Sequence, residues 1–170
     1  LHTSKAASAM LRRSRYDLVL VNGIAGWTLH SPPPIINIHH GTLRGAAVAM
    51  AKITAGINTI RRMKRKVATA LTYWVSGTIE ALSAQAATVN VAVSRSVRDE
   101  LVNLYGLDNN RIRVIQNGVD VNHFYPIDRN AARSTLGISK DKFVVLFSGR
   151  NHLVKRIDLF VQLASLLQNS

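Results

Sequence analysis

The stretch that decides the fold is residues 89–118, VNVAVSRSVRDELVNLYGLDNNRIRVIQNG. It opens with an apolar run, Val89–Val93, that predicts a β-strand. Apolar residues then recur at helical spacing over 97–104, and Gly106 is a typical helix end. A second apolar run, Ile112–Ile115, predicts another strand. A strand, a helix and a strand in this order predict two parallel strands joined by a right-handed crossover.

The same alternation extends along the chain in both directions. Further strands are predicted at Asp17–Val21, at Ile35–Ile38 and, most clearly, at the wholly apolar run Phe143–Phe147. Helical spacing recurs at 131–136 and at 157–167, and the second stripe is wide enough to predict packing against a sheet. The fold class that follows is α/β, with parallel sheets in Rossmann-like domains.

Two serines near residue 95 bear on where the next helix starts. Residues 96–99 have the form of a capping box with Asp in place of Glu. Ser94, which follows the strand, is interpreted as a cap or turn residue. It has no neighbouring His or carboxylate of the kind that activates a nucleophile.

The composition favours an anionic partner. The 170 residues hold 22 Lys and Arg against 9 Asp and Glu, a net charge of +13. Cysteine is absent, which excludes disulfides, thiolate metal sites and a cysteine nucleophile. A cysteine-free chain also fits a reducing compartment, so we expect a cytoplasmic location.

One segment raises the question of a membrane. Residues 67–93 carry a single charge, Glu80, but hold too many Ser, Thr, Asn and Gln residues for a membrane span. They predict a soluble helix followed by a strand. The preceding basic run, Arg61–Lys66, with Tyr73 and Trp74 after it, suits peripheral contact with an anionic membrane at its inner face. A solvated helix face explains the same run equally well.

Polar residues follow three of the predicted strands, where ligands bind in open α/β sheets. His39, His40 and Gly41 follow the second strand. Either histidine suits a proton shuttle, a contact to a sugar hydroxyl or a metal ligand, but a lone histidine here more often packs in the core. Asn117-Gly118 predicts a turn, and Asp120 follows it.

The last predicted strand is followed by Gly149 and Arg150, with Lys155 at the start of the next helix. Glycine allows close approach of the backbone, and the two cations beside a helix N-terminus suit a diphosphate. The alternative is two solvated bases, which are common in so basic a chain.

Four ordered blocks carry a family resemblance. Residues 91–101, VAVSRSVRDEL, 111–126, RIRVIQNGVDVNHFYP, 132–138, ARSTLGI, and 143–159, FVVLFSGRNHLVKRIDL, stand in a characteristic order. Together they resemble the large retaining glycosyltransferase family four, also called glycosyl transferases group 1. Residues 16–90 resemble the later strands of that family's N-terminal domain more loosely.

The resemblance implies a GT-B architecture with two Rossmann-like domains. Residues 1–120 would end the N-terminal, acceptor-side domain, 121–141 would form a linker, and 142–170 would give the first βα unit of the donor domain. The chain would then be a fragment, inactive by itself, of an enzyme that acts in cell-envelope or polysaccharide biosynthesis. The alternatives are a basic module that binds nucleic acid or a membrane surface, and another GT-B-like enzyme such as an epimerase or phosphorylase.

The resemblance also implies roles for particular residues. Gly149, Arg150 and Lys155 would bind the diphosphate of a nucleotide-sugar donor, with no metal or other cofactor required. His40, or else His39, would lie at the reaction centre. Asn117, Gly118 and Asp120 would lie at the domain junction. The acceptor would be a sugar, a lipid-linked molecule or a glycan, and no specific nucleic acid is expected. Arg156 departs from the family pattern, where glycine follows the lysine.

Overall fold

The computed structural model describes residues 2–29, 33–54, 60–150 and 155–168. Within these ranges the side chains of 2–5, 53–54, 60–68 and 168 lie outside the description. The chain divides into two units, Leu1–Asn117 and Gly118–Ser170. No helix in the described part of the chain is both long enough and apolar enough to cross a membrane.

The first unit is built on a parallel sheet of four strands in the order β1-β2-β3-β4. The strands are β1 (Val19–Asn22), β2 (Ile35–His39), β3 (Val89–Ala92) and β4 (Ile112–Val114). Val21 aligns with Asn37, and Asn37 in turn aligns with Asn90. All four strands confirm the sequence-based predictions, with ends shifted by one or two residues.

Helices join these strands as the parallel order requires. After α1 (His2–Arg13), the 3₁₀ turn η1 (Gly23–Gly26) follows β1. The crossover from β2 to β3 is made of α2 (Leu43–Thr54) and α3 (Ile60–Ala86), and that from β3 to β4 is made of α4 (Arg95–Tyr105) and the 3₁₀ turn η2 (Asn109–Arg111). The predicted helix and strand over 67–93 are thus confirmed.

The core lies between one face of the sheet and helices α3 and α4. Ala81 and Ala84 of α3 pack with Val97 and Leu101 of α4, over β3 and β4. A second cluster joins β1 and β2 to residues of α1. The opposite face of the sheet carries Leu20, which is 64% exposed. The inner face therefore holds the packing that stabilises this unit.

Helix α4 shows how its ends are fixed. The Ser94 hydroxyl accepts a hydrogen bond from the Val97 N–H at 3.2 Å, which makes Ser94 the N-cap. The prediction of a cap at Ser94 is confirmed, and the predicted capping box over residues 96–99 is wrong, because the helix has already begun at Arg95. Gly106 ends the helix with a left-handed φ of 68°, as its place in the sequence predicts.

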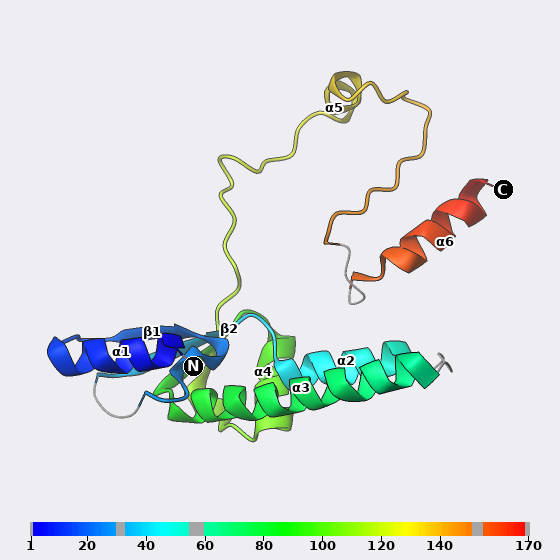
Figure 1. Ribbon diagram of the computed structural model, residues 1–170. Coiled ribbons are helices and arrows are strands. Elements are labelled where there is room, and N and C mark those ends of the chain that lie inside the picture. The colour runs from blue at the N-terminus through cyan, green and yellow to red at the C-terminus, as the bar shows by residue number, and fades with distance from the viewer. Residues whose placement is uncertain (1, 30–32, 55–59, 151–154, 169–170) are drawn as a thin grey trace. The chain divides into compact units, whose positions relative to one another are not determined.

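The α2–α3 hairpin projects past the sheet at the carboxyl ends of the strands. Glu80 of α3 lies level with this edge, since its carboxylate bonds the N–H of Leu43 at the start of α2. Thr88, just after α3, lies at the opposite edge, where its hydroxyl accepts a hydrogen bond from the Ile35 N–H. Residues 60–79 must therefore extend roughly 30 Å beyond the carboxyl edge. Figure 1 shows α2 and α3 side by side along this projection.

The second unit contains α5 (Arg129–Thr135) and α6 (Ile157–Gln168), which confirms the two helices predicted there. Residues 143–147 form no strand, so the clearest strand prediction is wrong, while the assignment of 142–170 to the start of a donor domain stays a prediction. The described residues of this unit contain no other strand that could supply hydrogen-bonding partners. Phe143 and Leu146 are accordingly 85% and 86% exposed. The described residues of this unit hold no sheet on which α6 could pack, so that packing stays a prediction.

The segment after β4 also differs from its prediction. Asn117-Gly118 forms no turn, and the turn comes later, at residues 121–123. Asp120 shapes it: its side chain accepts a hydrogen bond from the Asn122 N–H at 2.9 Å, and its carbonyl accepts one from the Phe124 N–H at 2.8 Å. An Asx-type turn has taken the place of the Asn-Gly turn.

Candidate functional site at the carboxyl edge of the sheet

The carboxyl ends of β1 and β2 carry the candidate site of the first unit. Strand β2 ends at His39, and His40 and Gly41 lead from it into α2. Strand β1 ends at Asn22, and Gly23 begins the turn η1 beside it. Because the two strands are parallel neighbours, both loops lie at one edge of the sheet.

His39 is a buried core residue. Its Nε2 lies 2.9 Å from Asn90 Oδ1, and the Asn90 amide in turn donates to the Ala84 carbonyl at 3.0 Å. Asn90 therefore presents its oxygen to the ring, so the imidazole proton is on Nε2. Desolvation by burial lowers the pKa of His39, which keeps the ring neutral at pH 7. No hydrogen-bond partner of Nδ1 is found among the described residues.

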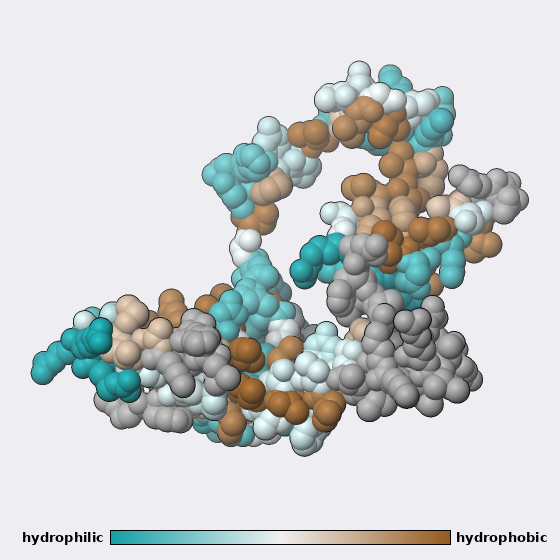
Figure 2. Space-filling model, in the orientation of Figure 1, coloured by the Kyte–Doolittle hydropathy of each residue, from teal (hydrophilic) through white to brown (hydrophobic). Residues whose placement is uncertain are grey.

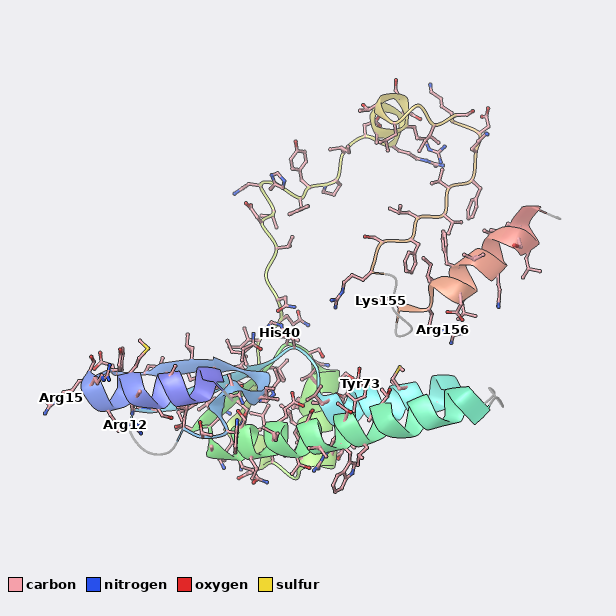
Figure 3. All side chains as sticks on the ribbon, viewed as in Figure 1. Arg12, Arg15, His40, Tyr73, Lys155 and Arg156 are labelled. Carbon is pink, nitrogen blue, oxygen red and sulfur yellow. The ribbon has the colours of Figure 1, made fainter. Side chains whose placement is uncertain are left out.

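His40 is exposed one residue later, beyond the end of the strand (Figure 3). The alternation of a strand turns its side chain away from the face that buries His39. Gly41 beside it is also exposed, and a Cβ there would meet nothing within 4 Å. Of the two histidines, only His40 is open to a ligand from solution, and its role stays a prediction.

Glu80 fixes the loop that carries His40. Its Oε2 accepts hydrogen bonds from the Leu43 N–H at 2.7 Å and from the Tyr105 hydroxyl. Burial, together with this bond to Glu80, raises the pKa of Tyr105 well above its usual range. One buried carboxylate thus joins α2, α3 and α4. The sequence offered a signal for Glu80, as the lone charge in residues 67–93, but it did not predict this role.

The start of α2 is held by further contacts. The Thr42 hydroxyl accepts from the Gly45 N–H at 2.9 Å and donates to Glu100 at 2.6 Å. Arg44 stacks on the Tyr105 ring, 5.0 Å from its centroid, and donates to the Leu104 carbonyl at 2.5 Å. The first turn of α2 is thereby held to α4 at several points, so the His40 loop has a rigid support.

The loop after β1 is held in a similar way. Gly23 has a left-handed φ of 58°, which favours glycine. The Ser83 hydroxyl donates to the Gly23 carbonyl at 2.7 Å and accepts from the Gly26 N–H at 3.0 Å. The Asn37 amide donates to the same carbonyl at 2.9 Å. Sequence reasoning missed both residues. Ser83 is one of many polar residues in 67–93, and Asn37 is a single polar residue in an apolar strand, and neither pattern indicates a partner.

In the second unit the structure brings together two of the three residues predicted to bind a diphosphate. A Cβ on Gly149 would lie 3.7 Å from Lys155 Cδ and 3.4 Å from the Phe147 ring, so lysine and glycine are neighbours. Arg150 is exposed. Four residues between Arg150 and Lys155, 151–154, lie outside the described residues. The binding role of all three stays a prediction.

Arg156 next to Lys155 has an unusual backbone. Its φ of 53° makes it the only non-glycine residue with a positive φ among the described residues. Its guanidinium pairs with Asp158 through two nitrogens, at 3.0 and 2.8 Å. The residue that departs from the family's glycine therefore adopts a conformation that glycine favours.

The remaining predicted residues lie where the two units join in sequence. Asn117 ends the first unit and Gly118 begins the second, with Asp120 in the turn described above. All three are exposed. The described part of the chain holds no group of three His, Cys, Asp or Glu residues that could bind a metal.

Comparison with known proteins places the chain in a family. Residues 1–123 match the model of Glycosyltransferase Family 4. The D-inositol 3-phosphate glycosyltransferase 1 of Catenulispora acidiphila is 39% identical over 77 residues, which are 45% of this chain and 18% of that protein. The D-inositol 3-phosphate glycosyltransferase of Rhodococcus opacus is 42% identical over 75 residues, which are 44% and 17%.

The matched part of the chain thus spans less than a fifth of those relatives. The family model, in contrast, covers well over half of the chain, including the whole four-stranded sheet and the His40 loop. The parallel sheet with its crossover helices also has the α/β architecture that the family resemblance predicted. This chain belongs to Glycosyltransferase Family 4.

Proposed function

We propose that the protein to which this chain belongs transfers a sugar from a nucleoside-diphosphate sugar to an acceptor hydroxyl, with retention at the anomeric carbon. The observation that carries the proposal is the family match over 1–123, which includes the exposed His40 at the carboxyl edge of the sheet. In open α/β sheets this edge is where ligands bind.

Arg150 and Lys155 are proposed to bind the donor diphosphate. As the bond from the anomeric carbon to the diphosphate oxygen breaks, negative charge grows on the leaving group. Preorganised cations stabilise that charge and lower the barrier. Lys155 lies beside Gly149, a residue without a side chain that would separate the backbone from a bound phosphate. With two cations in this role, the chemistry needs no metal.

His40 is proposed to contact the sugar near the reacting carbon. The loop that carries His40 is fixed by hydrogen bonds. Gly41 and Thr42 connect His40 to the first turn of α2, which Glu80 and Glu100 hold in place. The relatives are named for D-inositol 3-phosphate, so a phosphorylated polyol joins sugars, lipid-linked molecules and glycans as a candidate acceptor. A phosphorylated acceptor would also suit the net charge of +13.

The test is an assay of the whole protein with a panel of nucleoside-diphosphate sugars and these acceptors. Arg150→Ala and Lys155→Ala should each lower kcat/KM by about 100-fold, as loss of one charge-stabilising group does elsewhere. His40→Ala should also reduce turnover. Lys140→Ala, which removes an exposed cation of the same unit, is the matched control. Full activity in both Arg150→Ala and Lys155→Ala would contradict the proposal.

A further inference from the structure

An exposed apolar stripe runs along the outer side of α3. It consists of Leu71, Trp74, Val75 and Leu82, whose exposed fractions lie between 47% and 63%. Their spacing of three, four and seven residues places them on one helical face. The opposite side of α3 packs inward through Glu80, Ala81, Ser83 and Ala84. Figure 2 shows apolar side chains gathered along the described part of α3.

Apart from the buried Glu80, all charged side chains of α3 are positive. Glu80 is its only acidic residue, and the Leu43 N–H and the Tyr105 hydroxyl already bind that carboxylate in the interior. The sequence of the first two turns carries five Lys and Arg residues within 61–66. Lys52, near the end of the adjacent α2, is exposed as well. The outer face of α3 therefore carries an apolar stripe and no negative charge, on a helix whose first turns are rich in Lys and Arg.

We infer that the α3 stripe docks this protein on an anionic lipid surface. Apolar side chains beside Lys and Arg, with Trp among them, are the features of a helix that lies in the membrane interface. The stripe inserts below the headgroups, and the cationic start of α3 meets anionic headgroups, which are enriched in the cytoplasmic leaflet. In this arrangement helix α3 lies along the membrane surface, as amphipathic interfacial helices do.

A lipid surface explains more of the observations than a nucleic acid does. A nucleic acid would satisfy the cations but would leave Leu71, Val75 and Leu82 in water, because phosphates and sugars offer them no apolar contact. A site for single-stranded nucleic acid would also need aromatic residues interleaved with the charges. The described apolar stripe instead follows the basic run along the helix, as amphipathic interfacial helices require.

The position of the stripe connects docking to the candidate site. Leu71, Trp74 and Val75 lie on the part of α3 that projects past the carboxyl edge, the same edge that exposes His40. Docking through this projection would hold that edge close to the membrane, where a lipid-linked acceptor presents its hydroxyl. This last step rests on the proposed function, whereas docking itself does not.

The experiment measures binding of the 170-residue chain to vesicles without any sugar nucleotide. Vesicles of phosphatidylcholine alone are compared with vesicles that contain one-fifth phosphatidylglycerol, by flotation at low and high salt. We expect binding to the anionic vesicles that weakens with salt. In a Trp27→Phe background, brominated lipids should quench the fluorescence of Trp74, because it enters the bilayer.

Variants separate the stripe from other apolar surface. Leu71→Gln with Val75→Gln should weaken binding at least tenfold and abolish the quenching. Leu166→Gln in α6 and Leu20→Gln on the open face of the sheet remove side chains of similar exposure, 69% and 64%, and should bind like the parent. Far-UV circular dichroism checks that each variant keeps its helices.

Three outcomes would overturn the inference. One is equal binding to neutral and anionic vesicles, and another is unchanged binding and quenching in the Leu71→Gln/Val75→Gln variant. The third is tight binding to duplex DNA, displaced by salt but indifferent to the stripe, with no binding to vesicles. None of them bears on glycosyl transfer, so the two proposals fail separately.

Discussion

The two units of the chain have similar apolar patterns and different degrees of burial. In the first unit Leu101 is fully buried, and it packs with residues of α3, β3 and β4. In the second unit Leu166, at an equivalent position in a helical stripe, is 69% exposed. An apolar stripe thus gains stability only when a complementary surface exists to cover it.

The two units differ in the same way in their apolar runs, because one run pairs with neighbouring strands and the other does not. Val89–Ala92 lies between β2 and β4 and bonds with both. Phe143–Phe147 is more apolar, yet the described residues of its unit supply no neighbouring strand. Strand propensity measures how a side chain fits a half-buried pleated surface, and it has little effect without one. Most of the stability of the described chain should therefore lie in the first unit.

The largest effect should come from Leu101→Ala. Removing a fully buried leucine leaves a cavity in the α3–α4 core, and the free energy of unfolding should fall by about 3 kcal/mol. Both tryptophans, Trp27 and Trp74, lie in the first unit, so fluorescence during urea unfolding reports on that unit alone.

The matched change in the second unit is Leu166→Ala. Because this side chain is already exposed, the free energy of unfolding obtained from urea denaturation should change by less than about 0.5 kcal/mol. A comparable loss in Leu166→Ala and Leu101→Ala would show that the second unit contributes to the same core, and would break the comparison.

The next effect concerns the carboxylate that joins three helices. Tyr105→Phe leaves Glu80 buried with one donor fewer, which should cost about 2 kcal/mol at neutral pH. The wild type should also lose stability above about pH 10, because tyrosine ionises there when unfolded while Tyr105, with its raised pKa, is still neutral when folded. Tyr105→Phe should not show the part of this loss at high pH that comes from Tyr105. Urea unfolding at pH 7 and pH 10.5 measures both effects, with the exposed Tyr16→Phe as control.

Sequence reasoning recovered the regular part of the first unit, since short strands and crossover helices follow from local periodicity. It separated neither His39 from His40 nor Glu80 from an ordinary helix residue. Those distinctions depend on which face of β2 meets Asn90 and on Tyr105 reaching Glu80, both contacts between distant residues. For Phe143–Phe147 the local pattern was clear, but the residues that the structure describes in this unit offer no neighbouring strand for it to pair with.

His39 gives a test of pH dependence that distinguishes it from His40. The pKa of His39 is lowered by burial, so the unfolded chain takes up a proton near pH 6.5 that the folded chain does not. Its contribution to stability is therefore present above that pH and is lost as the pH falls below it. Urea unfolding at pH 7.5 and pH 5.0 should show the loss.

Two variants assign this effect to one histidine. His39→Gln, whose amide can still donate to Asn90, should lose less stability between pH 7.5 and pH 5.0 than the wild type. His40→Gln changes an exposed side chain and should lose as much as the wild type. If His40→Gln instead removed the pH dependence, the assignment of His39 to the core and His40 to the surface would be wrong.

The last effect, that of Arg156→Gly, has the opposite sign. Arg156 adopts a left-handed φ of 53°, which is unfavourable for any residue with a Cβ and is readily adopted by glycine. Its pairing with Asp158 is exposed and contributes little to compensate. Relief of the backbone cost should shift the equilibrium that forms the start of α6 by roughly fivefold toward the helix. Amide chemical shifts of Leu159 and Phe160, whose N–H groups bond the Arg156 carbonyl, measure that shift.

Arg156→Ala is the control, because it removes the ion pair and keeps the Cβ. If Ala raised helix formation as much as Gly does, the ion pair would be the source of the strain, and the left-handed backbone would carry no cost. If only Gly raised it, the second unit would hold an unfavourable local conformation with no core to offset it. In the first unit, by contrast, the buried Ser83 and Glu80 hold the loops after β1 and β2.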